Sequence, residues 1–417
     1  MPGRSLRIAW LGAGPAARET GGAPGVATEM LRGLARRGHR IDCFLPGSGH
    51  PLPARLDGVE NLTFNWGTSE WRWSSWYNRT RIGAFVSGLL NRGFASLRLR
   101  RQVLRRHRET PYDVIYQFNN IESLAMPSRL RGRVPLVIQP GTHAMGELRF
   151  LISEWRLSLR CQPPQTLAIA VAVLSARALV QRATIGRARL LVCISGVFRD
   201  HMVRDYGFPL ERTVVVPNPV QLGRFADADL AREIGAPPTI LVLGRVAVRK
   251  GVEDVVAVAR ALLERGIDVR IRIIGRTSLF SDYTKLLEDL PPENSEFLGS
   301  IPPTEVPAML AHSDLLLQAS KYEPFGLTVG EALAAGVLVV ATTEVGAIEG
   351  VDGSVGASVR PGDVEGMVAA IVAMLDSLRA RPAELRAKAR AEAERLFAPE
   401  LVCEQISAAL ERIVDGG

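Results

Sequence analysis

The chain has 417 residues, 47% of them hydrophobic and 23% charged, with a formal net charge of +8 at pH 7. A chain of this length is too long for one hydrophobic core, so the sequence predicts two domains of about 150–200 residues each. The composition is that of an ordinary soluble globular protein. A spanning helix needs about 18 consecutive apolar residues. The nearest run, Leu167 to Val180, is too short and contains Ser175 and Arg177, so no spanning helix is expected.

The chain begins with MPGRSLRIAWLGAGPAAR, which shares its basic residues and apolar stretch with signal peptides. A periodic helical pattern follows at once, so we interpret this stretch as a first strand that runs into a glycine turn. The four cysteines, Cys43, Cys161, Cys193 and Cys403, have the spacing of no metal site or disulfide framework. Their pattern favours a reducing, cytoplasmic compartment.

The positive charge is concentrated in one segment. Residues 71–108 contain ten arginines and no acid, so the rest of the chain is slightly negative. Three tryptophans are followed by apolar residues spaced by threes and fours, which is typical of an amphipathic helix. Two interpretations stay open: a helix that lies on an anionic membrane surface, or a helix whose apolar stripe packs on a sheet while its arginines face solvent. Nucleic-acid binding is disfavoured, because no binding motif accompanies the arginines.

Apolar runs that look like strands alternate with helical patterns, which predicts βαβ units and two doubly wound parallel sheets. The strands expected in the first half are Leu6–Leu11, Arg40–Leu45, Asp113–Phe118, Leu136–Gln139, Leu190–Ile194 and Thr213–Pro217. Those expected in the second half are Thr239–Leu243, Val269–Ile274, Ser295–Leu298, Asp314–Gln318, Val337–Ala341 and Ala357–Val359.

The break between the halves predicts the domain boundaries. The stretch before residue 239 is rich in Pro, Asn and Gly. We therefore expect a first domain at 1–215, a linker at 216–238, a second domain at 239–397, and a final helix at 398–417 that packs back on the first domain. Ligands bind at the carboxyl ends of strands in open parallel sheets. Two such sheets that face each other predict a cleft for two substrates.

The stretch GRVAVRKG follows the first strand of the second half. Arg245 and Lys250 lie at this strand-to-helix turn, where two positive charges and backbone donors suit a pyrophosphate. A solvated basic loop is the alternative.

The stretch EPFGLTVGEALAAG places two acids around a glycine turn at a helix start. Gly326 lets the backbone approach a ligand closely. Glu331 lies about one turn inside the helix, where a carboxylate can accept hydrogen bonds from the hydroxyls of a ribose or hexose. Alternatively, Glu323 is a surface turn residue and Glu331 a first-turn acid that the helix dipole favours.

Together, these stretches resemble glycosyltransferase family 4, a group of retaining nucleotide-sugar glycosyltransferases with the GT-B fold. The stretches that carry the resemblance are ETGGAPGVATEMLRGLARRGHRIDCF, VVVPNPVQLGRF, GRVAVRKG, SEFLGSIPPTEVPAMLAHSDLLLQAS and EPFGLTVGEALAAG. The resemblance covers nearly the full chain and is thinnest between Asn65 and Arg187. It implies an α/β GT-B fold, in which two Rossmann-like domains with doubly wound parallel sheets face each other across a cleft.

The resemblance also implies a reaction. It implies metal-independent transfer of a hexosyl group, with retention, from a UDP-, GDP- or ADP-linked sugar to an acceptor hydroxyl in glycan biosynthesis. The first domain would bind the acceptor, which is a sugar, a lipid-linked molecule or a small molecule, and the second domain would bind the donor. No cofactor is implied. A cytoplasmic enzyme at the inner face of the membrane fits these expectations, with 71–108 as the segment that contacts lipid.

Site residues follow from the same resemblance. Glu323 is expected beside the transferred sugar, and Glu331 is expected to hold the ribose hydroxyls. Arg245 and Lys250 are expected to bind the diphosphate, and Gly22 is expected to approach it closely. His143 is expected to face the cleft near the donor sugar or the acceptor. Backbone contacts to the donor are expected from Phe325, Gly326, Leu327 and Thr328. No metal site is expected.

Some features depart from the family pattern or favour other functions. The chain has Gly275-Arg276-Thr277 where the family often has Gly-x-Gly, which leaves base recognition open. Asp227-Ala228-Asp229 is interpreted as a pair of capping acids, not a metal site. The glycines at Gly12–Gly14 are a weak dinucleotide motif. A GT-B epimerase or phosphorylase, or a non-catalytic sugar-nucleotide-binding protein at a membrane surface, stays as an alternative.

Overall fold

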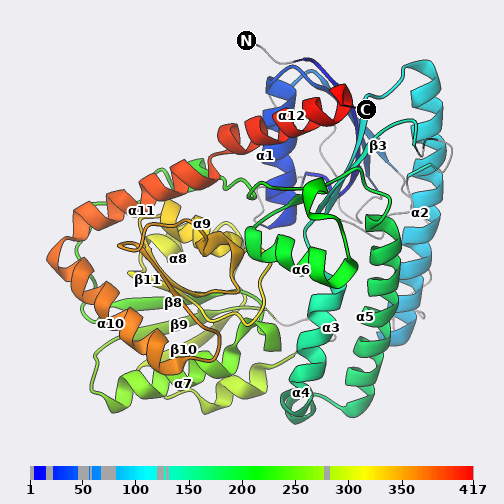
Figure 1. Ribbon diagram of the computed structural model, residues 1–417. Helices are drawn as coiled ribbons and strands as arrows, with labels where there is room; N and C mark the ends of the chain where they lie inside the picture. Colours follow the sequence, from blue (N-terminus) through cyan, green and yellow to red (C-terminus); the bar gives the residue numbers. More distant parts are fainter. Residues whose placement is uncertain are drawn as a thin grey trace.

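The computed structural model of the chain has two α/β domains, each built on one parallel sheet (Figure 1). It describes residues 4–15, 22–45, 56, 59–66, 81–119, 126–127, 130, 132–276 and 282–416, with the backbone alone over 81–94. The predicted GT-B arrangement of two parallel-sheet domains is confirmed.

The first sheet has seven parallel strands in the order β3-β2-β1-β4-β5-β6-β7. Their bounds are β1 Arg7–Gly12, β2 Arg40–Leu45, β3 Leu62–Trp66, β4 Val114–Asn119, β5 Leu136–Pro140, β6 Leu190–Cys193 and β7 Thr213–Val215. Six of these are the predicted strands, and β3 was missed. It lies at the sheet edge with no buried side chain among its described residues, so it lacks the apolar run of a central strand. The helices are α1 Ala23–Arg36, α2 Arg81–Glu109, α3 Ala144–Ser153, α4 Trp155–Cys161, α5 Pro164–Ile185 and α6 Gly196–Tyr206.

The second sheet has six parallel strands in the order β10-β9-β8-β11-β12-β13. Their bounds are β8 Thr239–Leu243, β9 Arg270–Ile274, β10 Ser295–Gly299, β11 Leu315–Gln318, β12 Leu338–Thr342 and β13 Gly356–Val359. All six were predicted within a residue or two of these bounds. The central strands β8, β11 and β12 are continuous apolar runs, which is typical of strands covered on both faces. The helices are α7 Val252–Glu264, α8 Val306–Ala311, α9 Leu327–Ala334, α10 Val364–Ala380 and α11 Pro382–Phe397.

The described part of the arginine-rich segment packs on the first sheet. Leu99 and Val103 of α2 are buried in the core of the first domain, while Arg101 and Arg105 on the other side of the helix are exposed. The three tryptophans of this segment, and the side chains of 81–94, lie outside the described residues. Over residues 95–108 the apolar stripe therefore covers the sheet, and the arginines form a solvated face.

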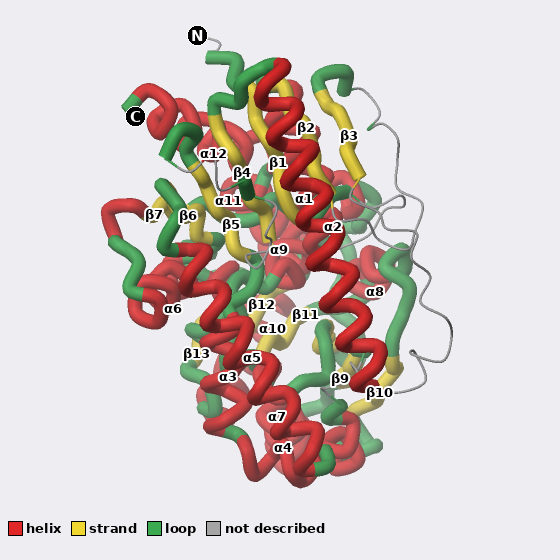
Figure 2. Tube along the Cα trace, turned by 90° about the vertical axis from the view of Figure 1, so that its right-hand side faces the viewer, coloured by secondary structure: helices red, strands yellow, loops and turns green. Residues whose placement is uncertain are grey.

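Helix α5 differs from the sequence-based expectation. Among the described residues it is the helix that is long and apolar enough to cross a membrane, by length and composition alone. Only 22% of its most apolar 18-residue window is buried. Ser175 and Arg177 do not interrupt the window, because two polar residues leave its mean hydropathy high. Figure 2 shows α5 beside α3, with α4 at the far end of the pair.

The last helix, α12 Pro399–Asp415, returns to the first domain (Figure 1). Its buried side chains Val402, Ile406 and Leu410 share one hydrophobic cluster with Met30 and Leu31 of α1. His39 Nε2 lies 2.7 Å from the Ser407 hydroxyl, which adds a buried polar contact. The first domain therefore depends on the last segment of the chain for part of its core.

Ile406→Ala should destabilise the first domain. Ile406 is fully buried, and truncating a buried isoleucine costs about 2–5 kcal/mol. Urea denaturation followed by tryptophan fluorescence measures this loss, because all six tryptophans lie within the first 155 residues. Leu401→Ala on the exposed side of α12 is the matched control and should change the free energy of unfolding by less than about 0.5 kcal/mol. Equal effects of the two changes would contradict the packing of α12.

Candidate active site

Two loops of the second domain lie side by side because their strands are neighbours. GRVAVRKG follows β8, and the turn with Glu323 follows β11, and these strands pair in parallel. Parallel pairing brings the carboxyl ends of both strands to the same edge of the sheet. Arg245 and Lys250 both line a small cavity at this edge, together with residues after β11.

Glu323 is held by two cations. Its Oε2 accepts a hydrogen bond of 2.9 Å from Arg249 Nη1 and forms an ion pair with Lys250 Nζ. The side chains of all three residues are about 15% exposed or less. Burial alone would raise the pKa of Glu323, but Lys250 and Arg249 lower it to about 2. Glu323 is therefore ionised and fixed in position, so it is not a free surface acid.

Arg249 is a residue of this cluster that the sequence analysis missed. Its carbonyl oxygen accepts a hydrogen bond of 2.9 Å from the Lys321 amide. Its guanidinium also donates to the Tyr322 carbonyl oxygen at 3.2 Å. Arg249 thus connects the loop after β8, which carries the cations, to the loop after β11, which carries Glu323. We call these two the cation loop and the acid loop. The only signal of Arg249 in the sequence was its place beside Lys250, and a single basic neighbour does not distinguish a buried partner from a surface residue.

Arg245 differs from the two cations beside Glu323. It is exposed at the end of β8, and no ion pair holds it among the residues that the structure describes. Its charge is therefore available to an anionic ligand. The predicted pair, Arg245 and Lys250, is brought to one edge of the sheet, but only Lys250 contacts Glu323 directly.

Glu331 has the opposite electrostatic environment to Glu323. It lies in α9 with a side chain 14% exposed, and its nearest cation is Arg224, whose Nη1 is 3.4 Å away. Burial raises the pKa of Glu331 to about 7, and Arg224 opposes the rise only in part. The two acids of the motif therefore differ: Glu323 is ionised at neutral pH, whereas the pKa of Glu331 lies near neutrality.

The side chains of the glycine turn between Glu323 and Glu331 pack inside the protein, so the turn can offer only its backbone to a ligand. Gly326 has φ 90°, and a Cβ there would lie 2.8 Å from a methyl group of Val345. Phe325 is buried and packs edge-on against Phe397, while the Thr328 hydroxyl donates to Gln318 at 2.9 Å. Leu327 packs against the cores of both domains, so this turn lies at the domain interface.

The turn before α1 contains Gly22, whose predicted approach to a diphosphate stays a prediction. Gly22 precedes α1 with φ 74°, and the space around its Cβ position is open. Residues 16–21 lie outside the described part of the chain. Thr277, in the stretch Gly275-Arg276-Thr277 that departs from the family's Gly-x-Gly, also lies outside it.

Asp229 accepts a hydrogen bond of 2.9 Å from the Ala231 amide. It therefore closes a turn, and no helix follows it within the described linker.

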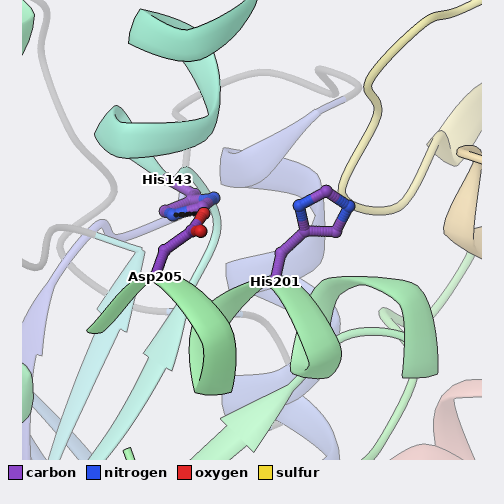
Figure 3. Close-up of side chains that lie close together, drawn as sticks. All are labelled: His143, His201 and Asp205. Carbon is purple, nitrogen blue, oxygen red and sulfur yellow. Dashed lines mark ion pairs between the residues drawn. The ribbon is translucent and has the colours of Figure 1, made fainter. Parts of the chain in front are cut away.

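His143 lies between the domains and is fully buried (Figure 3). Its Nδ1 is 2.7 Å from the hydroxyl of Tyr322, and its Nε2 is 3.1 Å from Asp205 Oδ2. Burial lowers the pKa of His143, while Asp205 opposes the shift. The ring therefore contacts the residue next to Glu323, and its surface is closed to solvent in this arrangement.

Three side chains here have the composition of a metal site. The ligand atoms of His143, His201 and Asp205 all lie within 4.8 Å of one another (Figure 3). However, Asp205 also accepts hydrogen bonds from the guanidinium groups of Arg149 and Arg204. Two adjacent positive charges oppose a bound cation. We therefore assign this cluster to the domain interface and not to a metal.

The two halves of the chain match two family models. Residues 20–224 match a model described as Glycosyltransferase Family 4, and residues 230–395 match a model described as Glycosyl transferases group 1. The chain belongs to glycosyltransferase family 4. The predicted family is confirmed, and both matched regions contain residues of the site.

Curated members of the family match part of the chain. The glycogen synthase of Mycobacterium tuberculosis is 31% identical over 210 residues, which are 49% of each chain. The phosphatidyl-myo-inositol mannosyltransferase of Mycolicibacterium smegmatis is 37% identical over 179 residues, 40% of this chain and 44% of that protein. The chain thus spans about half the length of the curated relatives it matches.

Solved structures match nearly the whole fold. The sucrose-phosphate synthase from Thermosynechococcus elongatus has a TM-score of 0.71 at 18% identity, over 99% of this chain and 100% of that one. The Anabaena protein HepE in complex with UDP and glucose has a TM-score of 0.62 at 20% identity, over 97% of this chain and 99% of that one. These likenesses establish the fold.

Arg249→Met should destabilise the second domain. The change leaves the buried Glu323 with one cation and removes a tie to Tyr322, and breaking a buried ion pair costs about 3–5 kcal/mol. Urea denaturation followed by far-UV circular dichroism measures the loss. Arg265→Met, which removes the exposed partner of Glu365, is the control and should cost less than about 1 kcal/mol. A loss at Arg249 no larger than the control would mean that the cluster does not hold the loops together.

Glu331→Gln should change how stability depends on pH. The folded-state pKa of Glu331 is raised to about 7, so the folded chain binds a proton that the unfolded chain releases. Stability therefore falls as the pH rises from the unfolded pKa, about 4.3, to the folded one. Relative to the native chain, Glu331→Gln should gain about 1–3 kcal/mol at pH 8 and little at pH 4. Denaturation curves at both pH values test this, and a gain that is equal at both would contradict it.

Proposed function

We propose that the chain is a retaining, metal-independent hexosyltransferase that uses a nucleotide-diphospho-sugar. The observation that carries the proposal is the pairing of Lys250 with Glu323 at the shared edge of β8 and β11. One cation and one acid are thereby held side by side where a donor would place its diphosphate and its sugar. Family membership supports the same reaction class.

The positive charges of Arg245 and Lys250 would stabilise the diphosphate as it leaves. Bond breaking at the anomeric carbon develops negative charge on the leaving phosphate oxygen. Arg245 is exposed and unpaired among the described residues, and Lys250 can exchange its contact with Glu323 for a phosphate oxygen. Arg249 then remains on Glu323, so the acid keeps a counter-ion throughout. Preorganised cations of this kind commonly provide the largest share of catalysis in phosphate departure.

The two acids have different tasks in this proposal. Glu323 is ionised and fixed, which suits an acceptor of hydrogen bonds from the transferred sugar. Glu331 has a pKa near neutrality, and a partner that donates two hydroxyl hydrogen bonds, such as a ribose, would favour its ionised form. The backbone at Gly326–Thr328 would complete the contacts.

His143 would act by holding the loop with Glu323 in place. It is closed to solvent, and its contact with Tyr322 connects the first domain to the residue before Glu323. We propose that it orients this acid loop when the two domains meet around the donor. A direct contact with the sugar would require the ring to leave its present pocket.

The donor and acceptor are proposed by class. HepE was solved with UDP and glucose, which supports a UDP-linked sugar, with GDP- and ADP-linked sugars as further candidates. The curated relatives include enzymes named for glycogen and for phosphatidylinositol, so sugar, lipid-linked and small-molecule acceptors are all proposed. The arginines of 71–108 would favour an anionic or lipid-linked acceptor. The described cysteines are all free thiols, which supports a cytoplasmic location.

Lys250→Ala and Glu331→Ala should each abolish transfer while the fold stays intact. Loss of one charge-stabilising group typically lowers kcat by about 100-fold or more. A thermal-shift panel of UDP-, GDP- and ADP-sugars first selects the donor, since a ligand that binds only the folded chain raises Tm. Transfer is then measured with that donor, and circular dichroism verifies folding.

Lys388→Ala is the matched control. Lys388 is an exposed lysine of α11 that pairs with Asp352 and belongs to neither loop, and its loss should leave the rate unchanged. Native rates in Lys250→Ala would remove the site assignment. Isomerisation of the donor without transfer would instead assign the chain as an epimerase.

A further inference from the structure

Helices α3, α4 and α5 form a hairpin (Figure 1), and an unusual share of the exposed apolar side chains lies on it. Eleven large hydrophobic side chains are exposed among the described residues, and five of them lie in this hairpin. These five are Ile152, Trp155, Leu159, Leu179 and Val180. A concentration of this kind marks an interaction surface, whereas scattered exposed leucines need no explanation.

One side of the hairpin is occupied by the second domain. Glu154 receives an ion pair from Lys321 at 3.0 Å, and the Ser158 hydroxyl lies 2.9 Å from that of Tyr283. Ile152 lies in the last turn of α3, and Trp155 and Leu159 lie one turn apart on one face of α4. We call these three residues the tip patch. Ser158 is buried against the second domain, and the tip patch stays exposed beside that contact.

The helices that carry the tip patch and its apolar extension are basic. Helices α4 and α5 contain four arginines and no acid, and one of these arginines, Arg160, pairs with Asp289 of the second domain. Arg156 lies over the ring of Trp155, with its guanidinium carbon 5.5 Å from the ring centre. Helix α5 extends the apolar surface, because most of its apolar window is unburied. A partner must therefore be apolar at its centre and negative around it.

An anionic lipid surface has both properties. Tryptophan and leucine insert at the level of the headgroups, while adjacent arginines contact lipid phosphates. Each arginine near such a surface adds about 1 kcal/mol. A symmetric contact with a second copy would bring the same arginines against one another, and like charges across an interface are costly. The charge pattern therefore favours lipid over self-association.

We propose that the tip patch docks on an anionic membrane surface. Trp155, Leu159 and Ile152 enter the interfacial layer, and Arg156 contacts the headgroups. The hairpin is tied to Lys321, two residues before Glu323, so docking would hold the candidate active site near the lipid surface. The proposal goes beyond the proposed function, because docking is measured without donor or acceptor.

The test is co-sedimentation of the full chain with lipid vesicles. Vesicles of phosphatidylcholine are compared with vesicles that also contain about 30% phosphatidylglycerol, at low ionic strength. The native chain should bind the anionic vesicles about tenfold or more tightly than the neutral ones. Trp155→Glu/Leu159→Glu should lower the affinity for anionic vesicles about tenfold or more.

Leu210→Glu/Leu401→Glu is the matched control. It places the same two charges at leucines that are 55% and 37% exposed, against 48% and 38% for Trp155 and Leu159. Its vesicle affinity should fall much less than that of the tip variant. Both variants should keep the native Tm, which shows that a loss of binding is not a loss of folding.

A probe at Cys161 locates the contact. Cys161 ends α4 and is partly exposed, whereas the other three cysteines are buried, so one thiol can be labelled with a fluorophore. Lipids with a quencher near the headgroup should reduce its emission when anionic vesicles are added. The labelled control variant should show the same quenching, and the labelled tip variant should not.

Three results would overturn the proposal. The first is native-like vesicle binding by the tip variant. The second is binding that depends only on α2, seen as a loss in Arg101→Ser/Arg105→Ser while the tip variant binds normally. The third is a dimer in light scattering that the tip variant dissociates, which would assign the patch to a second copy. None of these results bears on the loss of transfer expected in Lys250→Ala, so the two proposals fail separately.

Discussion

The ion cluster of Glu323 with Arg249 and Lys250 is the interaction on which the candidate site depends. A carboxylate buried to this extent is costly unless it is paired. Two cations from one loop satisfy one acid from the neighbouring loop, and the pairing therefore fixes both loops at the edge of the sheet. The same contact leaves one net positive charge, because Glu323 pairs with two cations. A diphosphate would replace Glu323 as the acid partner of Lys250.

The cluster is continuous with the domain interface. Tyr322, next to Glu323, contacts His143 of the first domain, and its ring stacks on Phe150 at 5.4 Å. The first turn of α6 adds two hydrogen bonds, from the amides of Gly196 and Val197 to the carboxylate of Glu349. The position of the acid loop therefore depends on the contact between the two domains. Any motion that separates the domains must break the contact between His143 and Tyr322.

The sequence predicted most of the fold because the fold is parallel. Strands buried on both faces are uniformly apolar, so β11 and β12 were visible as runs of Leu and Val, whereas the edge strand β3 was not. Glu323 and Lys250 were found because they lie in loops that follow strands, and Glu331 was found from the motif that it forms with Glu323. The role of Arg249, and the contact of His143 with Tyr322, depend on pairing between segments far apart in the sequence, which no local pattern encodes. Helix α5 was judged too short because a run was required to be unbroken, while an average over the helix tolerates Ser175 and Arg177.

The position of α12 has a consequence for biosynthesis. The side chains of α12 that complete the core of the first domain are translated after the second domain, which lies between them and α1 in the chain. During synthesis, the first domain therefore keeps part of its apolar surface uncovered until α12 has left the ribosome, even though its own sheet was translated first.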